Sequence, residues 1–181
     1  MRAGTAQQQR RHEGGAVSGV AQIVSGAQLH DAEDTATPIA INGGTLSVSY
    51  TGGRSSNPLR TSAPDYLLLL GGGDPSLWSP LVLTITSTTA LTGLVLVGSG
   101  FAGGERFVSL SPLALSVEPD GGSEPTIANG GTELHSSGSG GPEYIAHFAD
   151  VSAAGSLQLT FTLAGSTSNV STNIRRLEFV S

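Results

Sequence analysis

The residues that could do chemistry are few, and the densest group of them is His30-Asp31-Ala32-Glu33-Asp34. Three carboxylates and an imidazole could hold a divalent cation, but a calcium loop needs oxygen donors at alternate positions around a glycine. The pentapeptide lacks that spacing, so we predict a solvated loop. His135 and His147 are expected to face outward from strands, because a zinc site would need a further ligand that the sequence does not nominate. We expect no metal and no cofactor.

No catalytic grouping stands out in the sequence. Gly98-Ser99-Gly100 and Gly138-Ser139-Gly140 do not fit the strand-to-helix elbow of a serine hydrolase. Neither a helix nor a lysine follows Gly71-Gly72-Gly73, as a phosphate loop would require. A pair of glycosidase carboxylates could be drawn from Asp65, Asp74, Glu105 and Glu143, but such a pairing is a three-dimensional property. We therefore expect a protein that is not an enzyme.

Aromatic side chains are the first candidates for binding. Trp78 lies between prolines in an expected loop, where its ring could stack on a sugar, anchor a neighbouring subunit or fill the core. Tyr50 and Tyr66 are the other aromatic candidates.

A second set of candidates is basic. Arg2, Arg10 and Arg11 fall at the start of the chain, where they could touch an anionic surface or form a solvated tail. Residues 1–15 as a whole are polar and lack apolar periodicity, so we expect a flexible arm that could become ordered against a neighbouring subunit. Residues 16–181 are expected to form a single domain.

Composition limits the partners. The chain has 181 residues and a net charge of −6, and only 12% of its residues are charged. The acidic residues are dispersed and the cations are not clustered, so the folded body is a poor partner for nucleic acid. A low-charge surface rich in Ser, Thr and Gly suits contact with proteins or sugars, because few charges need desolvation.

The sequence says less about where the protein is located. No apolar stretch reaches the length of a membrane helix, and the N-terminus lacks the order of a secretory signal. An extracellular protein would need either a leader that Met1 has replaced or another exit route, such as lysis. The absence of cysteine leaves the redox compartment undetermined.

Alternating apolar residues predict an all-β fold. In Ser156-Leu157-Gln158-Leu159-Thr160-Phe161-Thr162-Leu163 every second residue is apolar, as in a strand with one buried face. Similar segments give about ten strands and no convincing helix, which predicts a jelly roll or β-sandwich. We expect long connections at 54–64 and 71–80. Strands 105–110 and 113–117 are expected to pair with each other around Ser111-Pro112. A turn is expected at 119–122.

Asn-Gly turns recur in the chain. Asn42-Gly43 should join strands 39–41 and 45–50 as a hairpin. Asn42-Gly43-Gly44-Thr45 recurs as Asn129-Gly130-Gly131-Thr132, through either a duplicated half-domain or independent selection of the same turn chemistry.

The C-terminal residues carry a family resemblance. Residues 143–151 and 155–163, followed by Ile174-Arg175-Arg176-Leu177-Glu178-Phe179, resemble the closing strands of galactose-binding-like jelly rolls, including many carbohydrate-binding modules. Those families typically end in a strand of the form Ile-x-x-Leu-Glu-Phe. The resemblance implies a β-sandwich, with glycan binding in some relatives.

These observations predict a non-catalytic structural subunit of a larger assembly. A virion component, such as a head-decoration, tail or spike protein, fits the arm and the low-charge surface. Its partners would be neighbouring subunits in a homo-oligomer. We expect the loops at 54–64, 71–80 and 138–142 to make the contacts between subunits. The alternative is a carbohydrate-binding or adhesion module. Either function places the protein on a virion surface or outside a cell.

Overall fold

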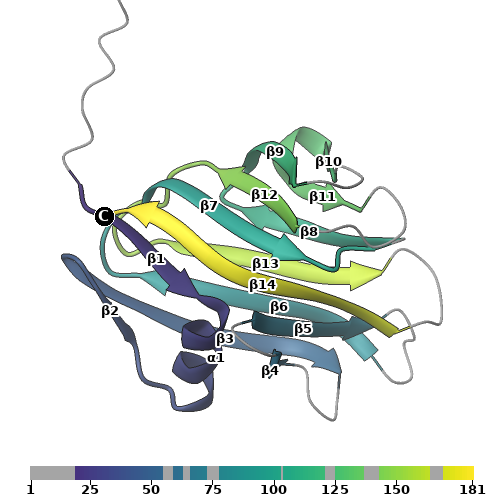
Figure 1. Cartoon of the computed structure of the whole chain (residues 1–181), viewed down its shortest axis with the longest axis horizontal. Coiled ribbons are helices and arrows are strands. Elements are labelled where there is room, and N and C mark those ends of the chain that lie inside the picture. The colour runs from purple at the N-terminus through teal and green to yellow at the C-terminus, as the bar shows by residue number, and fades with distance from the viewer. Residues whose placement is uncertain are drawn as a thin grey trace, which may run out of the picture.

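Two antiparallel sheets pack face to face, and a single helix lies beside them (Figure 1). The computed structural model describes residues 19–54, 59–62, 66–72, 78–102, 104–120, 125–136, 143–163 and 169–181. This part of the chain contains fourteen strands, one α-helix and one 3₁₀ turn. The predicted all-β sandwich is confirmed.

The two sheets are named A and B. Sheet A has the order β4 (Leu59–Ser62), β5 (Tyr66–Gly72), β14 (Asn169–Val180), β7 (Thr92–Ser99), β12 (Glu143–Phe148), β9 (Ala114–Asp120), with β1 (Ala21–Ser25) also paired to β14. Sheet B has the order β10 (Thr126–Ala128), β11 (Glu133–His135), β8 (Glu105–Ser111), β13 (Ser156–Leu163), β6 (Trp78–Ser87), β3 (Gly44–Arg54), β2 (Ile39–Ile41). Most connections cross from one sheet to the other, as in a jelly roll.

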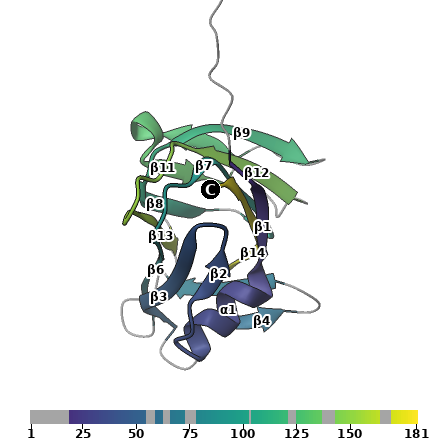
Figure 2. The same ribbon diagram turned by 90° about the vertical axis from the view of Figure 1, so that its left-hand side faces the viewer.

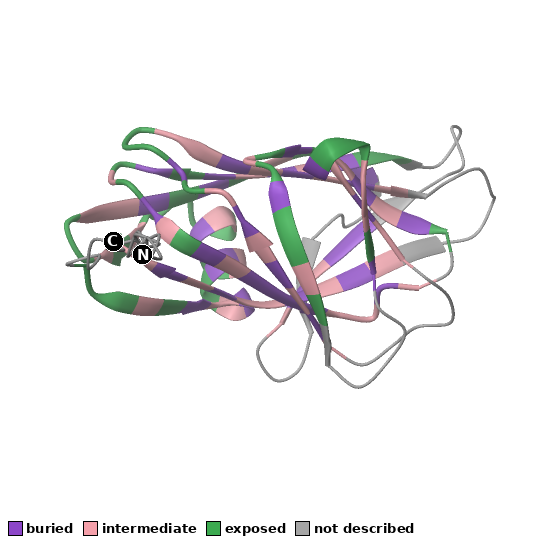
Figure 3. Ribbon diagram, turned by 90° about the horizontal axis from the view of Figure 1, so that it is seen from above, coloured by how far each residue is buried: buried purple, intermediate pink, exposed green. Residues whose placement is uncertain are grey.

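The core lies between the sheets and follows the period of two. In β13, Leu157, Leu159 and Phe161 are buried, while Gln158 and Thr160 between them are partly exposed. Buried and exposed residues alternate in this way along most strands (Figure 3). The predicted bounds of this strand are confirmed.

The first Asn-Gly turn is a hairpin, as predicted. Ile41 pairs with Gly44, so Asn42 and Gly43 form a two-residue loop, with Gly43 at a φ of 76°. In the second copy, residues 129–131 form a 3₁₀ turn between β10 and β11. The two copies therefore make different turns, which favours independent turn chemistry over duplication.

The prediction that the chain has no helix is wrong. Helix α1 (Gly26–Asp34) contains His30-Asp31-Ala32-Glu33-Asp34, which we predicted to be a loop. The signal for it was Ser25-x-x-Gln28, a capping box in which Ser25 Oγ accepts from the N–H of Gln28 and Gln28 Oε1 accepts from the N–H of Ser25. Leu29 and Ala32 are buried, and α1 covers the end of the sandwich near β2 and β3 (Figure 2).

Two predicted loops are shorter than expected. Strand β3 continues to Arg54, β4 occupies 59–62, β5 continues to Gly72, and β6 begins at Trp78. Pro80 fits inside β6 because the facing strand is irregular at Gly52, whose φ is 76° and whose Cβ would overlap the Pro80 carbonyl. Residues 55–58, 63–65 and 73–77 lie outside the described residues.

The predicted pairing of strands 105–110 and 113–117 is also wrong. Strand β8 belongs to sheet B and pairs with β11 and β13, whereas β9 belongs to sheet A and pairs with β12. The connection at Ser111-Pro112 therefore crosses between the sheets instead of closing a hairpin. Pro119 and Asp120 end β9, and residues 121–124 of the predicted turn are not described.

Candidate functional site

Polar and aromatic side chains gather on the outer face of sheet A, the face turned away from sheet B. Tyr66 on β5, Asn173 and Arg175 on β14, and Glu143 on β12 all lie there, because their strand neighbours Leu67, Thr172, Ile174 and Tyr144 are buried between the sheets. We call these four outer residues the Arg175 cluster. They come from strands far apart in sequence that the sheet order brings together.

Arg175 is the centre of this cluster. Its guanidinium makes an ion pair with the Glu143 carboxylate and lies over the ring of Tyr66, 4.8 Å from the ring centroid. Arg175 occupies an irregularity in β14, where the register with β7 shifts between Ile174 and Arg176. The extra residue turns Arg175 outward next to another outward residue, Arg176.

Asn173 adds a planar amide beside this ion pair. It pairs with Ser99 on β7 and Leu68 on β5, and its Oδ1 is buried without a hydrogen-bond partner among the described residues. A Cβ on Gly100, whose φ is 73°, would lie 3.3 Å from Asn173 Nδ2, so glycine leaves room for the amide. Asn173 Oδ1 is therefore a buried acceptor whose desolvation is not offset by a hydrogen bond within the described residues.

A second polar group lies beneath the cluster, between the sheets. Glu105 is only 6% exposed, and its carboxylate accepts hydrogen bonds from the N–H of Ala102 at 2.6 Å and of Ser171 at 3.0 Å. Burial raises the pKa of Glu105, an effect that these two backbone hydrogen bonds oppose. Because Glu105 begins β8 and Ser171 belongs to β14, this carboxylate joins sheet B to the strand that carries Arg175.

Tyr144 packs beside Glu105 in the same interior region. Burial raises the pKa of its phenol strongly. Its ring lies 5.3 Å from that of Phe101, which stacks on Phe107 at 5.5 Å. These rings form a rigid base under the Arg175 cluster.

Glu105 and Glu143, two of the carboxylates considered for glycoside hydrolysis, do not form a pair. Glu105 points between the sheets, whereas Glu143 lies on the outer face of sheet A. A retaining or inverting mechanism needs both carboxyl groups on either side of one bond. Asp65 and Asp74 lie outside the described residues.

The three aromatic candidates lie on strands of different sheets. Tyr66 belongs to sheet A and to the Arg175 cluster, whereas Tyr50 and Trp78 belong to sheet B. Tyr50 is partly buried against the core, and the backbone of Trp78 pairs with Arg54 at the start of β6. Arg2, Arg10 and Arg11 lie outside the described residues.

The histidines face outward from strands, as predicted. His135 on β11 is 2.6 Å from Glu133, and His147 on β12 is 3.2 Å from Glu118. His147 lies on the face opposite Tyr144 and Phe148. Within the described residues, no group of three or more potential ligands is placed to hold a metal ion.

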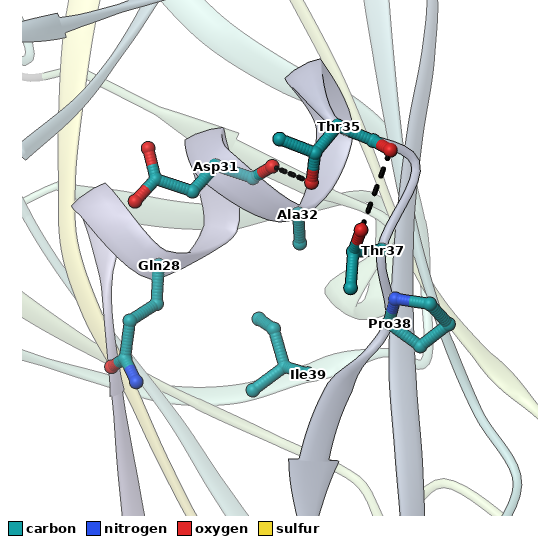
Figure 4. A pocket seen from close by; sticks show the side chains of 7 residues that line it. All are labelled: Gln28, Asp31, Ala32, Thr35, Thr37, Pro38 and Ile39. Atoms are coloured by element: carbon teal, nitrogen blue, oxygen red, sulfur yellow. Dashed lines mark hydrogen bonds between the residues drawn. The ribbon is translucent and has the colours of Figure 1, made fainter.

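A surface cavity of about 200 Å³ lies between α1 and the start of β2 (Figure 4). Ala32, Pro38 and Ile39 supply its apolar lining, and Gln28 and Asp31 lie at its polar rim. The segment that closes it is held by Thr35, whose hydroxyl donates to the Asp31 carbonyl at 2.7 Å.

Sequence reasoning missed Asn173 and Arg175 as candidate residues, and it considered Glu143 only as a glycosidase carboxylate. One signal was present in the sequence. The core residues Ile174 and Leu177 are three positions apart, which breaks the period of two and indicates an irregular strand at the two arginines. Nothing in the sequence paired Arg175 with Glu143, because that contact depends on the order of strands in sheet A.

Comparisons with known proteins give one similar structure to describe. No family model matches the sequence, and no curated protein matches it. The chain is similar to the solved CBM32-1 and CBM32-2 domains of ZmpB from Clostridium perfringens, with 9% identity and a TM-score of 0.25 over 80% of this chain and 42% of that one. This chain thus spans less than half the length of that structure. Sheets A and B themselves confirm the β-sandwich that the C-terminal resemblance implied.

Among the described residues, no helix is long and apolar enough to cross a membrane.

Proposed function

We propose that this chain is a non-catalytic domain that binds a neutral glycan at the Arg175 cluster. The observation that carries the proposal is the placement of Arg175 between the Glu143 carboxylate and the Tyr66 ring on an outer sheet face. The ion pair balances the charge of the guanidinium, so the cluster favours an uncharged partner. The protein would act outside a cell or on a virion surface.

The chemistry of the cluster matches that of a sugar. Arg175 donates several N–H groups in a fixed plane and Glu143 accepts, so neighbouring sugar hydroxyls can be bound from one side. The Tyr66 ring can pack against the C–H face of a sugar. Because sheet A holds these groups, little ordering entropy is lost on binding.

A glycan array with the intact protein tests the proposal first. For a glycan found on the array, Tyr66→Ala should weaken binding about two-fold to ten-fold, because an aromatic contact is worth about 0.5–1.5 kcal/mol. Arg175→Gln should weaken it about ten-fold to one-hundred-fold, because a hydrogen bond from a charged donor contributes about 1.5–3 kcal/mol.

Matched controls separate binding from folding. Tyr66→Phe keeps the ring, and Arg176→Gln removes the neighbouring arginine, which bonds to Glu178 at 2.6 Å. Both should retain binding. Trp78→Ala is measured in parallel, because loss of binding in that variant alone would move the site to sheet B. Absence of any bound glycan would remove the proposal.

A structural subunit of a larger assembly, such as a virion component, is the second candidate function. It is favoured by Leu113 and Leu115, which are 43% and 63% exposed at strand β9, the end strand of sheet A. Exposed leucines at a sheet edge are typical of a surface that contacts protein. Deleting residues 1–15 tests the expected role of the arm, and unchanged incorporation into an assembly would count against it.

A further inference from the structure

The cavity between α1 and β2 has the lining of a site for a long cationic side chain. Ala32 and Ile39 offer an apolar surface, and the Asp31 side chain at the rim is 77% exposed (Figure 4). Arginine combines an alkyl stem with a charged planar head, so one such side chain can use both parts of the lining.

The electrostatic surroundings of the cavity also favour a cation. Asp31, Glu33 and Asp34 all lie toward the C-terminal end of α1, and its last turn contains no basic residue. The C-terminal end of a helix carries a partial negative charge, which these carboxylates reinforce. His30 lies 3.8 Å from Asp31 but is largely buried. The rim therefore presents negative charge.

The chain itself contains a segment of the opposite charge. Residues 1–18 contain three arginines and one glutamate, whereas residues 19–181 contain five arginines and thirteen acidic residues. Arg10 and Arg11 form the only pair of adjacent basic residues in the sequence besides Arg175-Arg176. This segment and the rest of the chain therefore carry net charges of opposite sign.

The segment enters the fold close to the cavity. Val20 pairs with Ser181, whose hydroxyl donates to the Asn42 carbonyl at 2.9 Å, and Gln22 accepts from the N–H of Asn42 at 2.8 Å. Asn42 directly follows β2, the strand whose first residue is Ile39, so strand geometry puts the cavity about 10 Å further on. Gly19 comes eight positions after Arg11, and an extended chain of that length spans about 26 Å.

We propose that the N-terminal segment, residues 1–18, docks on its own domain with Arg10 or Arg11 in the α1–β2 cavity. The guanidinium bonds to the Asp31 carboxylate, and the alkyl stem covers Ala32 and Ile39. The tether gives the segment a high effective concentration at the cavity, so intramolecular docking wins over exchange between copies at low protein concentration. This role goes beyond glycan binding, which uses another face of the molecule.

A spin label on the full-length chain tests the docking. The protein has no cysteine, so Gln8→Cys provides a single attachment point beside the arginines. Paramagnetic broadening of amide signals should concentrate on α1 and β2, and it should fall at least two-fold in Asp31→Asn. It should fall similarly when salt rises from about 0.01 M to about 1 M, because the Debye length shrinks from about 30 Å to about 3 Å.

Two control variants show whether the broadening reports docking at the cavity. Glu118→Gln removes an exposed carboxylate on β9 and should leave the broadening unchanged, whereas Arg10→Gln combined with Arg11→Gln should abolish it. Broadening that is unaffected by Asp31→Asn, or that covers other elements, would overturn the proposal. Broadening that grows with protein concentration would assign the docked segment to a second copy and would also overturn it. None of these outcomes depends on whether a glycan binds.

Discussion

Glu105 is a buried acidic residue that bonds to β14. Its carboxylate accepts from Ala102 and Ser171, and its own carbonyl accepts from the N–H of Ser136 at 3.0 Å. Three chain segments therefore meet at one buried acidic residue. A buried carboxylate is costly unless it is hydrogen-bonded, and here backbone donors satisfy both oxygens.

The raised pKa of Glu105 predicts a pH dependence of stability. Its pKa in the folded protein lies above the ordinary value of 4.5, so the folded state binds this proton more tightly than the unfolded state. The contribution of Glu105 to the unfolding free energy is complete below 4.5 and is lost as pH rises through the folded-state pKa. Glu105→Gln should remove this part of the pH dependence in denaturant titrations.

The control for that measurement is Glu118→Gln, which changes an exposed carboxylate. This variant should keep the pH dependence of the unfolding free energy that the intact protein shows. The advantage of the intact protein over Glu105→Gln should be greater near pH 4.5 than near pH 7. The opposite slope would mean that Glu105 is stabilised as a carboxylate.

Gly98 is a residue whose side-chain size is limited by one neighbour. A Cβ at this position of β7 would overlap the ring of Tyr144. Gly98→Ala should therefore lower the unfolding free energy by about 1–3 kcal/mol, the usual effect of overpacking. Chemical denaturation measures the loss.

A double-mutant cycle with Tyr144→Leu shows whether the ring is the cause. Removing the ring makes room for the new methyl group, so the double variant should lose less stability than the sum of the single losses. Additive losses would point to the backbone of β7 instead.

Among the elements, α1 ends in an unfavourable conformation that a single substitution can relieve. Ala36 follows the helix with a φ of 52°, and its N–H donates to the Glu33 carbonyl at 3.2 Å. This is the left-handed position after a helix, which glycine occupies at lower cost than alanine. Ala36→Gly should raise the unfolding free energy by about 0.5–1 kcal/mol, measured by thermal or chemical denaturation.

Ala40→Gly is the matched control, because Ala40 lies in the extended strand β2 and is exposed. There glycine should lower stability by about 0.5–1 kcal/mol, since it only adds freedom to the unfolded chain. A gain in both variants would rule out relief of the helix end as the cause.

At the scale of the whole molecule, the two exposed leucines at β9, the end strand of sheet A, provide a test of the assembly function. Leu113 and Leu115 contribute little to the core, so replacing both by serine should change stability by less than about 0.5 kcal/mol each. If the chain is a subunit of an assembly through this edge, light scattering should show an oligomer that the double variant loses.

Val20→Ser with Ile23→Ser is the control for that experiment, because Ile23 on β1 and Val20 just before β1 are 64% and 55% exposed, at another part of sheet A. It should keep the oligomer. An intact chain that stays monomeric at every concentration would remove the assembly function, and an oligomer that survives the leucine changes would place the interface elsewhere.

Much of the fold was predictable because local patterns are sufficient for it. The alternation in residues 156–163 gave the bounds of β13, and Asn42-Gly43 gave the first hairpin. Helix α1 was not predicted, because its acidic residues are typical of a solvated loop. Its capping box and its buried Leu29 and Ala32 are the features that indicate a helix. The prediction that β8 pairs with β9 was wrong, because two strands that are adjacent in sequence can belong to different sheets.

The sequence by itself determined the class of fold and the outward histidines, since residue period and turn chemistry act over a few positions. Only the tertiary structure decided that Tyr66, Asn173, Arg175 and Glu143 form one cluster on the outer face of sheet A. The reason is physical: cross-strand contacts depend on strand order and register, which result from packing the whole core at once. A sequence of alternating residues states which face each side chain takes, but not which neighbours it meets there.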